Sequence, residues 1–225
     1  GLETQRNKGE VEEIRKEKKQ SKKKMSENMA KPTPIVPYLS PLLRKLKRGP
    51  AVTLPKDAGM FIAYTGIGKE SRVIELGSGS GFFTSQLANI VKEVISYEKR
   101  DEFLKIAEGN VKRCGFTNVI FKHRDVLGTE GIDEKDGTFD LVFCDIAEAE
   151  KIVPHAHVAL KPGGFLAAHC LHIEQAKALV LEAQKTFSEV SLVENLVRDY
   201  EVRDFGTRPR HMGIMHTAYL VFARK

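Results

Sequence analysis

Four acidic residues end successive apolar segments of the chain and could act together on one ligand. Glu75, Glu98, Asp125 and Asp145 each stand at or just beyond such a segment. Any one of them alone is more readily explained as a surface or helix-capping residue. If the segments are parallel strands, however, their carboxyl ends share one edge of a sheet, where ligands bind. Four acids in phase therefore predict a binding crevice.

A glycine-rich stretch follows the first of these acids. Residues 73–84 read V-I-E-L-G-S-G-S-G-F-F-T, with glycines at 77, 79 and 81. Glycines let backbone approach a ligand closely, and a helix that starts after them presents free N–H groups. Position 82 is Phe, where the dinucleotide-binding pattern G-x-G-x-x-G requires glycine, so the spacing disfavours a nicotinamide or flavin site. Glu98 lies 17 residues after Gly81, where a carboxylate that binds ribose hydroxyls is expected.

The elements that must position these residues alternate between strand and helix. Strands are expected at 72–76, 94–98, 118–122, 139–145 and 164–170. Helices are expected near 82–91, 101–114, 149–160 and 174–187. This alternation predicts an α/β fold with a mostly parallel sheet, right-handed crossovers and helices on both faces.

Both ends of this α/β region depart from the alternation. Residues 190–197 and 216–224 are β-rich with no helix between them, which predicts an antiparallel hairpin at the sheet edge. Upstream, 51–54 is a candidate short strand, and a helix should run from Pro55 through Tyr64 until Gly66 closes it.

The positive charge is concentrated at the N-terminal end. The net charge is +6, and residues 1–48 hold 14 Lys/Arg against 6 Asp/Glu. Residues 1–31 are too polar to fold alone, and four prolines make 31–41 an extended linker, so 1–48 is expected to be a largely disordered tail and linker ahead of a domain at 49–225. Such a tail either binds a polyanion such as RNA or is simply solvated.

Other features of the composition exclude several classes of protein. The three cysteines, at 114, 144 and 170, lack C-x-x-C spacing, so reduced thiols are expected and no metal site is predicted. The chain has neither an apolar run long enough to span a membrane nor a secretory signal, and we therefore expect a cytoplasmic protein without membrane contact.

The motifs resemble those of a known enzyme family. An acid two places before G-x-G-x-G is similar to motif I of the class I S-adenosylmethionine-dependent methyltransferases, which have a Rossmann-like sheet. K-R-G-P-A-V-T-L-P-K-D-A at 47–58, A-Y-T-G-I-G at 63–68 and the closing R-P-R-H-M-G-I-M-H-T-A-Y-L-V-F-A-R-K resemble the tRNA (adenine-N1)-methyltransferases of the T-loop adenine, especially the archaeal branch. This resemblance implies S-adenosylmethionine as cofactor, tRNA as substrate and a homotetramer.

The resemblance also implies roles for individual residues. Asp145 would be the catalytic carboxylate beside the target adenine, and Asp125 would bind the adenine amino group of the cofactor. Arg208 and His216 would lie on the RNA-facing side, although His216 is as readily a strand-end polar residue. The residues expected to surround the cofactor are Glu75, Gly77, Gly79, Ser80, Gly81, Phe82, Phe83, Glu98, Asp125 and Asp145.

The acceptor of the methyl group is less closely specified. Members of that family usually carry a proline soon after the motif IV aspartate, whereas this chain reads D-I-A-E from Asp145. Without an adenine as acceptor, Asp145 would simply be another acid that contacts the cofactor. Two alternatives therefore stay open, namely a methyltransferase of a protein or small molecule with the same fold, and a catalytically silent RNA-binding partner of an active homologue.

Overall fold

The computed structural model describes residues 39–49, 52–211 and 216–225. The chain divides into two units, Gly1–Pro37 and Tyr38–Lys225, and the second unit holds the whole described fold. The tail predicted at 1–31 and most of the proline linker lie outside the described residues.

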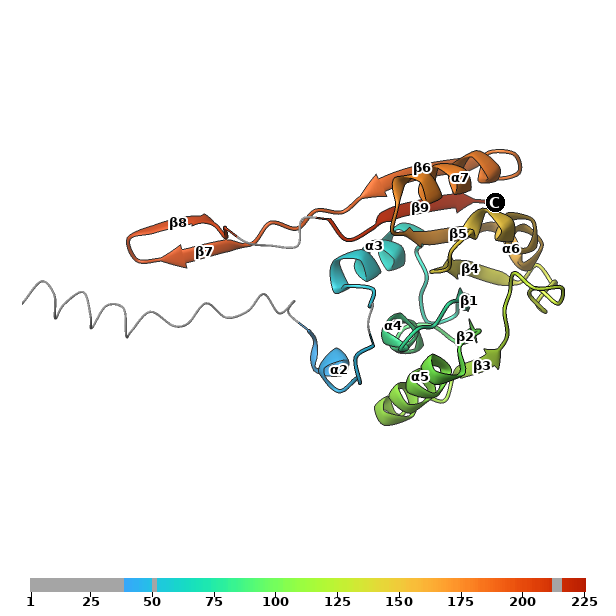
Figure 1. Ribbon diagram of the computed structural model, residues 1–225, viewed down its shortest axis with the longest axis horizontal. Helices are drawn as coiled ribbons and strands as arrows, with labels where there is room; N and C mark the ends of the chain where they lie inside the picture. Colours follow the sequence, from blue (N-terminus) through green and yellow to red (C-terminus); the bar gives the residue numbers. More distant parts are fainter. Residues whose placement is uncertain (1–38, 50–51, 212–215) are drawn as a thin grey trace, which may run out of the picture. The chain divides into compact units, whose positions relative to one another are not determined.

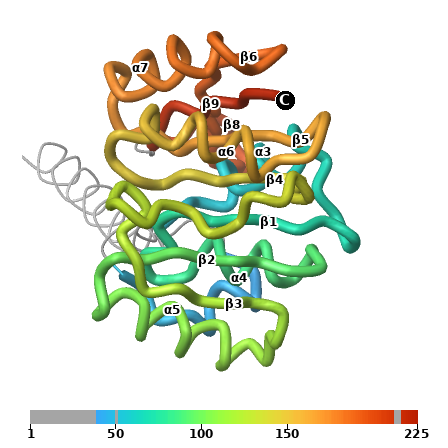
Figure 2. The backbone as a smooth tube through the Cα atoms, turned by 90° about the vertical axis from the view of Figure 1, so that its right-hand side faces the viewer, coloured from blue at the N-terminus to red at the C-terminus, as the bar shows by residue number. Residues whose placement is uncertain are grey.

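The centre of the fold is a seven-stranded sheet (Figures 1 and 2). Its strands, in spatial order, are β3 (Val119–His123), β2 (Glu93–Glu98), β1 (Arg72–Leu76), β4 (Phe139–Cys144), β5 (Leu160–Cys170), β9 (Tyr219–Arg224) and β6 (Glu189–Glu194). The pairs from β3 to β5 are parallel, whereas β9 is antiparallel to both β5 and β6. This arrangement confirms the predicted α/β sheet with an antiparallel C-terminal edge.

Helices cover both faces of the sheet. On one face, α3 (Pro55–Thr65) and α4 (Phe82–Ala88) pack against the sheet, and α5 (Asp101–Cys114) lies beside α4. On the other face pack the 3-10 helix η1 (Ala149–Ile152), α6 (Val153–Ala159) and α7 (Ile173–Ala183). The elements expected at 149–160 thus form two consecutive short helices. Within the described residues, no helix is long and apolar enough to cross a membrane.

Alternating side chains of the strands explain this two-sided core. In β1, Val73 faces the α3–α4 side, while Ile74 and Leu76 face the α6–α7 side, and all three are buried. Burying an aliphatic side chain of this size contributes about 1.5–3 kcal/mol. The same alternation turns Glu75 toward the α3–α4 side, so a carboxylate is placed inside the core.

Two features differ from the sequence-based expectation. The connection between β6 and β9 contains a second, two-stranded antiparallel sheet of β7 (Tyr200–Arg203) and β8 (Gly206–Pro209), which the sequence pattern did not predict. The short strand expected at 51–54 is wrong for its described residues 52–54, which lead without strand pairing into α3. The predicted end of α3 is confirmed, because Gly66 adopts a left-handed conformation with φ 64°.

Candidate functional site

The glycine loop between β1 and α4 requires its glycines for steric reasons. Gly77, Gly79 and Gly81 all have positive φ, a region that L side chains rarely adopt. A Cβ atom on Gly77 would lie 2.5 Å from the carbonyl oxygen of Asp145, and one on Gly81 would lie 2.9 Å from Cα of Ala107. The loop is therefore held tightly between the end of β4 and α5.

Glu75 is a buried carboxylate directly beneath this loop. Its Oε2 accepts hydrogen bonds from Thr84 Oγ1 and Ser96 Oγ, each at 2.6 Å. Burial raises the pKa of Glu75 to about 7, although these two hydrogen bonds partly oppose the increase; the nearby negative charges of Asp145 and Glu98 reinforce it. Glu75 can therefore change its charge near neutral pH.

Glu98, at the end of β2, is held by four hydrogen bonds. Its Oε1 accepts from the backbone N–H of Arg100 at 3.0 Å and from Arg100 Nε at 2.8 Å, and its Oε2 accepts from Gly79 N–H at 2.9 Å and Arg100 Nη2 at 3.2 Å. Burial alone would raise the pKa of Glu98, but the bonds from Arg100 and Gly79 lower it below its ordinary value. The guanidinium of Arg100 also lies over the Phe103 ring, 4.0 Å from its centroid.

Asp145 follows β4 and is the more exposed carboxylate at the centre of the site. Its backbone N–H donates to Leu76 O at 2.9 Å, which fixes it beside the end of β1. Its Oδ1 lies 3.5 Å from Nδ1 of His169, at the end of β5. The next residue, Ile146, is held through its carbonyl oxygen by Gln175 Nε2 at 2.8 Å.

Two hollows meet at Gly77 and Asp145. The larger has a volume of about 290 Å³, and the smaller about 20 Å³. The larger is lined by Gly77, Tyr97, Glu98, Lys99, Arg100, Arg124, Asp125, Val126, Leu127, Asp145, Ile146, Ala147 and Glu148. The smaller is lined by Val52, Thr53, Glu75, Gly77, Ser78, Gly79, Ser80, Phe82, Phe83, Phe143 and Asp145. The four predicted acids therefore divide between two adjoining hollows, and Asp145 borders both.

Hydroxyl groups in the smaller hollow lack partners. The Oγ atoms of Ser78 and Ser80 are buried and make no hydrogen bond within the described part of the chain. Unpartnered buried polar atoms are uncommon in native proteins, and a bound ligand is one reason for them. The smaller hollow thus has hydrogen-bonding capacity to offer a polar ligand.

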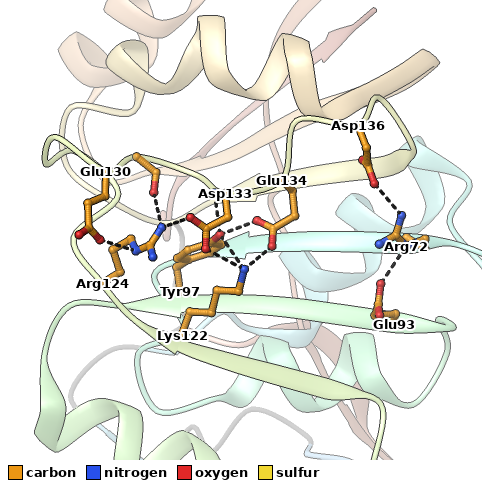
Figure 3. Close-up of polar contacts among 10 residues, drawn as sticks. Arg72, Glu93, Tyr97, Lys122, Arg124, Glu130, Asp133, Glu134 and Asp136 are labelled. Atoms are coloured by element: carbon orange, nitrogen blue, oxygen red, sulfur yellow. Dashed lines mark hydrogen bonds and ion pairs between the residues drawn. The ribbon is translucent and has the colours of Figure 1, made fainter.

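A polar network joins β2, β3 and the β3–β4 connection (Figure 3), and two of its residues, Tyr97 and Arg124, line the larger hollow. The Tyr97 hydroxyl binds Glu134, and it accepts a hydrogen bond from the backbone N–H of Asp133 at 3.1 Å. Lys122 Nζ binds Asp133 at 3.0 Å and also pairs with Glu134, and Arg124 pairs with Asp133. Burial, followed by the Glu134 carboxylate, raises the pKa of Tyr97 to about 12. The network holds the β3–β4 connection, which carries Asp125, against the sheet.

Asp125 lies at the rim of the larger hollow. Its side chain is about half exposed, its Oδ1 accepts from Leu127 N–H at 3.1 Å, and its Oδ2 lies 3.6 Å from Lys99 Nζ. Arg208 and His216 line neither hollow. Arg208 lies in β8 and contacts Glu201 at 3.4 Å, and His216 contacts Glu194 near the start of β9.

A short basic segment borders the glycine loop. In this basic strap (residues 39–49, including α2, Pro41–Arg44), Leu43 and Leu46 pack with Phe82, while Arg44, Lys45, Lys47 and Arg48 are exposed. The fully buried Asn110 exchanges hydrogen bonds of 2.7 and 2.8 Å with the backbone of Lys47, and it also donates to Ser80 O at 2.7 Å. Asn110 therefore ties the strap directly to the glycine loop.

Several of these residues were missed by reasoning from the sequence. Arg100 and Asn110 carry no local pattern, because their roles depend on contacts across the fold. His169 does have a signal, since it stands 24 residues after Asp145, the spacing by which β4 and β5 pair in register. In the described part of the chain, no three His, Cys, Asp or Glu side chains gather to hold a metal ion.

Comparison with known proteins identifies relatives over most of the chain. Residues 67–203 match the model of a methyltransferase domain family. A tRNA (adenine(57)-N(1)/adenine(58)-N(1))-methyltransferase of Methanocaldococcus jannaschii is 33% identical over 84% of this chain and 77% of its own length. The crystal structure of a tRNA (m1A58) methyltransferase from Aquifex aeolicus aligns with a TM-score of 0.75 at 29% identity, over 81% of this chain and 74% of that one. A SAM-dependent O-methyltransferase from Thermotoga maritima aligns with a TM-score of 0.76 at 32% identity, over 83% and 71% of the two chains.

Proposed function

This chain belongs to the tRNA (adenine-N1)-methyltransferase family of the methyltransferase domain proteins, and from that premise we propose that it transfers a methyl group from S-adenosylmethionine to N1 of an adenine in tRNA. The observation that carries the proposal is the position of Asp145. Its carboxylate borders both hollows, so a group held in one and a base entering beside it would meet at this side chain.

The polar groups that line the two hollows could form hydrogen bonds with the two ends of the cofactor. The larger offers Glu98 and Asp125 to a nucleoside, because a carboxylate can accept hydrogen bonds from ribose hydroxyls or an adenine amine. The smaller offers the unpartnered hydroxyls of Ser78 and Ser80, together with Glu75, to the charged amino-acid end. When bound, the cofactor supplies an electrophilic methyl group on a sulfonium.

Asp145 serves the acceptor base. Methyl transfer needs the attacking nitrogen aligned at about 3 Å more than it needs a strong base. The Asp145 carboxylate accepts a hydrogen bond from the exocyclic amine of adenine, which turns N1 toward the methyl group. Its negative charge also offsets the positive charge that develops on the base as the N–C bond forms.

The basic strap gives RNA a place to bind beside this site. Its four exposed cations lie on a segment that Asn110 ties to the glycine loop. Phosphate groups of an RNA attract such cations, and the attraction weakens as salt increases. We expect the strap to hold the RNA backbone while the target base leaves its stack and enters the crevice.

The main alternative is another methyl acceptor on the same fold. The similarity to a SAM-dependent O-methyltransferase of known structure favours this alternative, because its TM-score and coverage are close to those of the tRNA (m1A58) methyltransferase. A single assay can separate the two, because the position of the transferred methyl group identifies the acceptor.

The test incubates the full chain with labelled S-adenosylmethionine and unmodified tRNA transcripts, and maps the methylated nucleoside by mass spectrometry. We expect N1-methyladenosine. Asp145→Asn should lower kcat by about a hundredfold or more, in the range found when one transition-state stabiliser is removed. The matched control Glu108→Gln changes an exposed acid on α5 and should leave kcat unchanged. Label at another nucleoside, or in protein only, would overturn the proposed acceptor, and full activity of Asp145→Asn would overturn the role of Asp145.

A further inference from the structure

His169 stands beside Asp145 on the neighbouring strand. Cys144, the last residue of β4, pairs with Ala168 of β5 in parallel register, so Asp145, which follows β4, comes next to His169. Both side chains lie on the side of the sheet that α3 covers, and the Phe61 ring of α3 is 6.5 Å from the imidazole, centroid to centroid. The position of His169 therefore follows from strand register.

The imidazole has an unmet hydrogen-bonding group. His169 is only 8% exposed, and its Nδ1 is buried without a hydrogen-bond partner in the described part of the chain. The nearest acidic group is Asp145, whose Oδ1 lies 3.5 Å from this Nδ1. A hydrogen bond of normal length would require an approach of about half an ångström. Contacts in active sites are often this long without substrate and tighten when it binds.

The other described neighbours of the ring do not compete for this nitrogen. From α3 the neighbour is the apolar ring of Phe61, and from β9 the residue in register is Leu220. Within the described residues, Asp145 is the acid found within 4 Å of His169. The buried Nδ1 thus lies closest, among the described acids, to the carboxylate proposed to face the substrate.

We propose that His169 is a positioning residue for Asp145, a role that rests on the proposed function of that carboxylate. The Nδ1–H group donates to Oδ1 and fixes the plane of the carboxylate. Oδ2 is then free to accept from the exocyclic amine of the target adenine. Without the imidazole, the carboxylate, which is 36% exposed, rotates, and fewer substrate encounters have N1 aligned with the methyl group.

Two substitutions separate this role from simple packing. His169→Leu introduces an apolar side chain of similar size and removes the donor, whereas His169→Asn places an amide N–H close to the position of Nδ1. We expect His169→Leu to lower kcat about ten- to a hundredfold, the range for losing a hydrogen bond to a charged group. KM for tRNA and the affinity for S-adenosylmethionine, measured by calorimetry, should change less than about threefold. His169→Asn should restore kcat to within about fivefold of the wild type.

A double-mutant cycle with Asp145→Asn tests whether His169 acts through Asp145. If it does, His169→Leu should have little further effect on kcat in the Asp145→Asn background. Equal losses in both backgrounds, an Asn variant as poor as the Leu variant, or a change in KM alone would each overturn the proposal.

Nuclear magnetic resonance gives a readout that does not depend on turnover. The ¹⁵N shifts of His169 should report the Nδ1–H tautomer in the wild type and lose that preference in Asp145→Asn. An Nε2–H tautomer in the wild type would overturn the positioning role even if the enzyme is active. Failure to methylate tRNA would instead overturn the proposed function, while the tautomer and its response to Asp145→Asn still decide whether the two side chains are coupled.

Discussion

Replacing the buried Glu75 by glutamine should stabilise the protein increasingly as pH rises. The folded-state pKa of Glu75 is raised from 4.5 to about 7 by burial, so the folded protein favours the protonated side chain. Below about pH 4.5, the free energy of unfolding includes the full stabilisation from protonated Glu75. This stabilisation decreases as pH rises from about 4.5 to about 7 and is absent above that pH. The amide of Glu75→Gln would keep an oxygen for the hydrogen bonds of Thr84 and Ser96 and would carry no charge at any pH.

The size of the effect follows from the two pKa values. With 4.5 for the unfolded state and about 7 for the folded state, the ionisable side chain costs about 1 kcal/mol at pH 5 and about 3 kcal/mol at pH 8. Glu75→Gln should therefore gain about 2 kcal/mol over the wild type between these pH values. A cationic ligand in the smaller hollow would favour the ionised form, so its affinity for the wild type should rise up to pH 7.

Urea unfolding, followed by circular dichroism without cofactor at pH 5 and pH 8, measures this difference. The matched control Glu108→Gln removes an exposed charge, and its effect on the free energy of unfolding should stay within about 0.5 kcal/mol at both pH values. If the difference between Glu75→Gln and wild type were the same at pH 5 and pH 8, the buried carboxylate would not titrate between these pH values, and the reasoning from burial would be refuted.

Two further predictions concern the loop and the strap. Gly77→Ala should weaken S-adenosylmethionine binding, measured by calorimetry, about a hundredfold, because φ is 90° and the new Cβ would lie 2.5 Å from a carbonyl oxygen. The control Gly59→Ala, whose Cβ would meet nothing within 4 Å, should bind normally. Equal affinities of the two variants would contradict this prediction. Lys47→Ala combined with Arg48→Ala should reduce the slope of log affinity for tRNA against log salt by about 1.4 to 1.8 units, as expected for two lost phosphate contacts. The exposed Lys177→Ala on α7 should leave the slope unchanged, and an unchanged slope in the double variant would show that the strap does not bind phosphate.

The sequence predicts the sheet well where both periodicity and burial are strong. Residues 72–76 and 101–114 form β1 and α5 within the predicted limits, because a short buried apolar run and a helix with charged first and last turns are clear local signals. The β7–β8 sheet has no such signal. Val202 is 77% exposed and Phe205 is 84% exposed, so neither side of this hairpin follows the rule of apolar residues facing a core.

Only part of the candidate site was predictable from the sequence. The acids at strand ends could be found because parallel strands bring their carboxyl ends to one edge. Their division between two hollows could not, since it depends on how closely the glycine loop approaches Asp145. Likewise, the role proposed for His169 can be inferred only once the register of β4 and β5 is known.

The hydrogen bonds of Glu98 bear on its proposed role as a ligand for ribose, because its acceptor positions are already filled by groups of the protein. A carboxylate has about four acceptor positions, and here two are taken by backbone N–H groups and two by the guanidinium of Arg100. The Arg100 side chain is 50% exposed, whereas the Glu98 side chain is only 2% exposed, so the guanidinium can move into solvent but the carboxylate needs another donor in its place. In the proposed function, ribose hydroxyls would be those donors, while the bonds from Gly79 and the Arg100 backbone remain. Those two bonds keep the carboxylate oriented, and the two positions that Arg100 gives up match the two hydroxyl groups of a ribose.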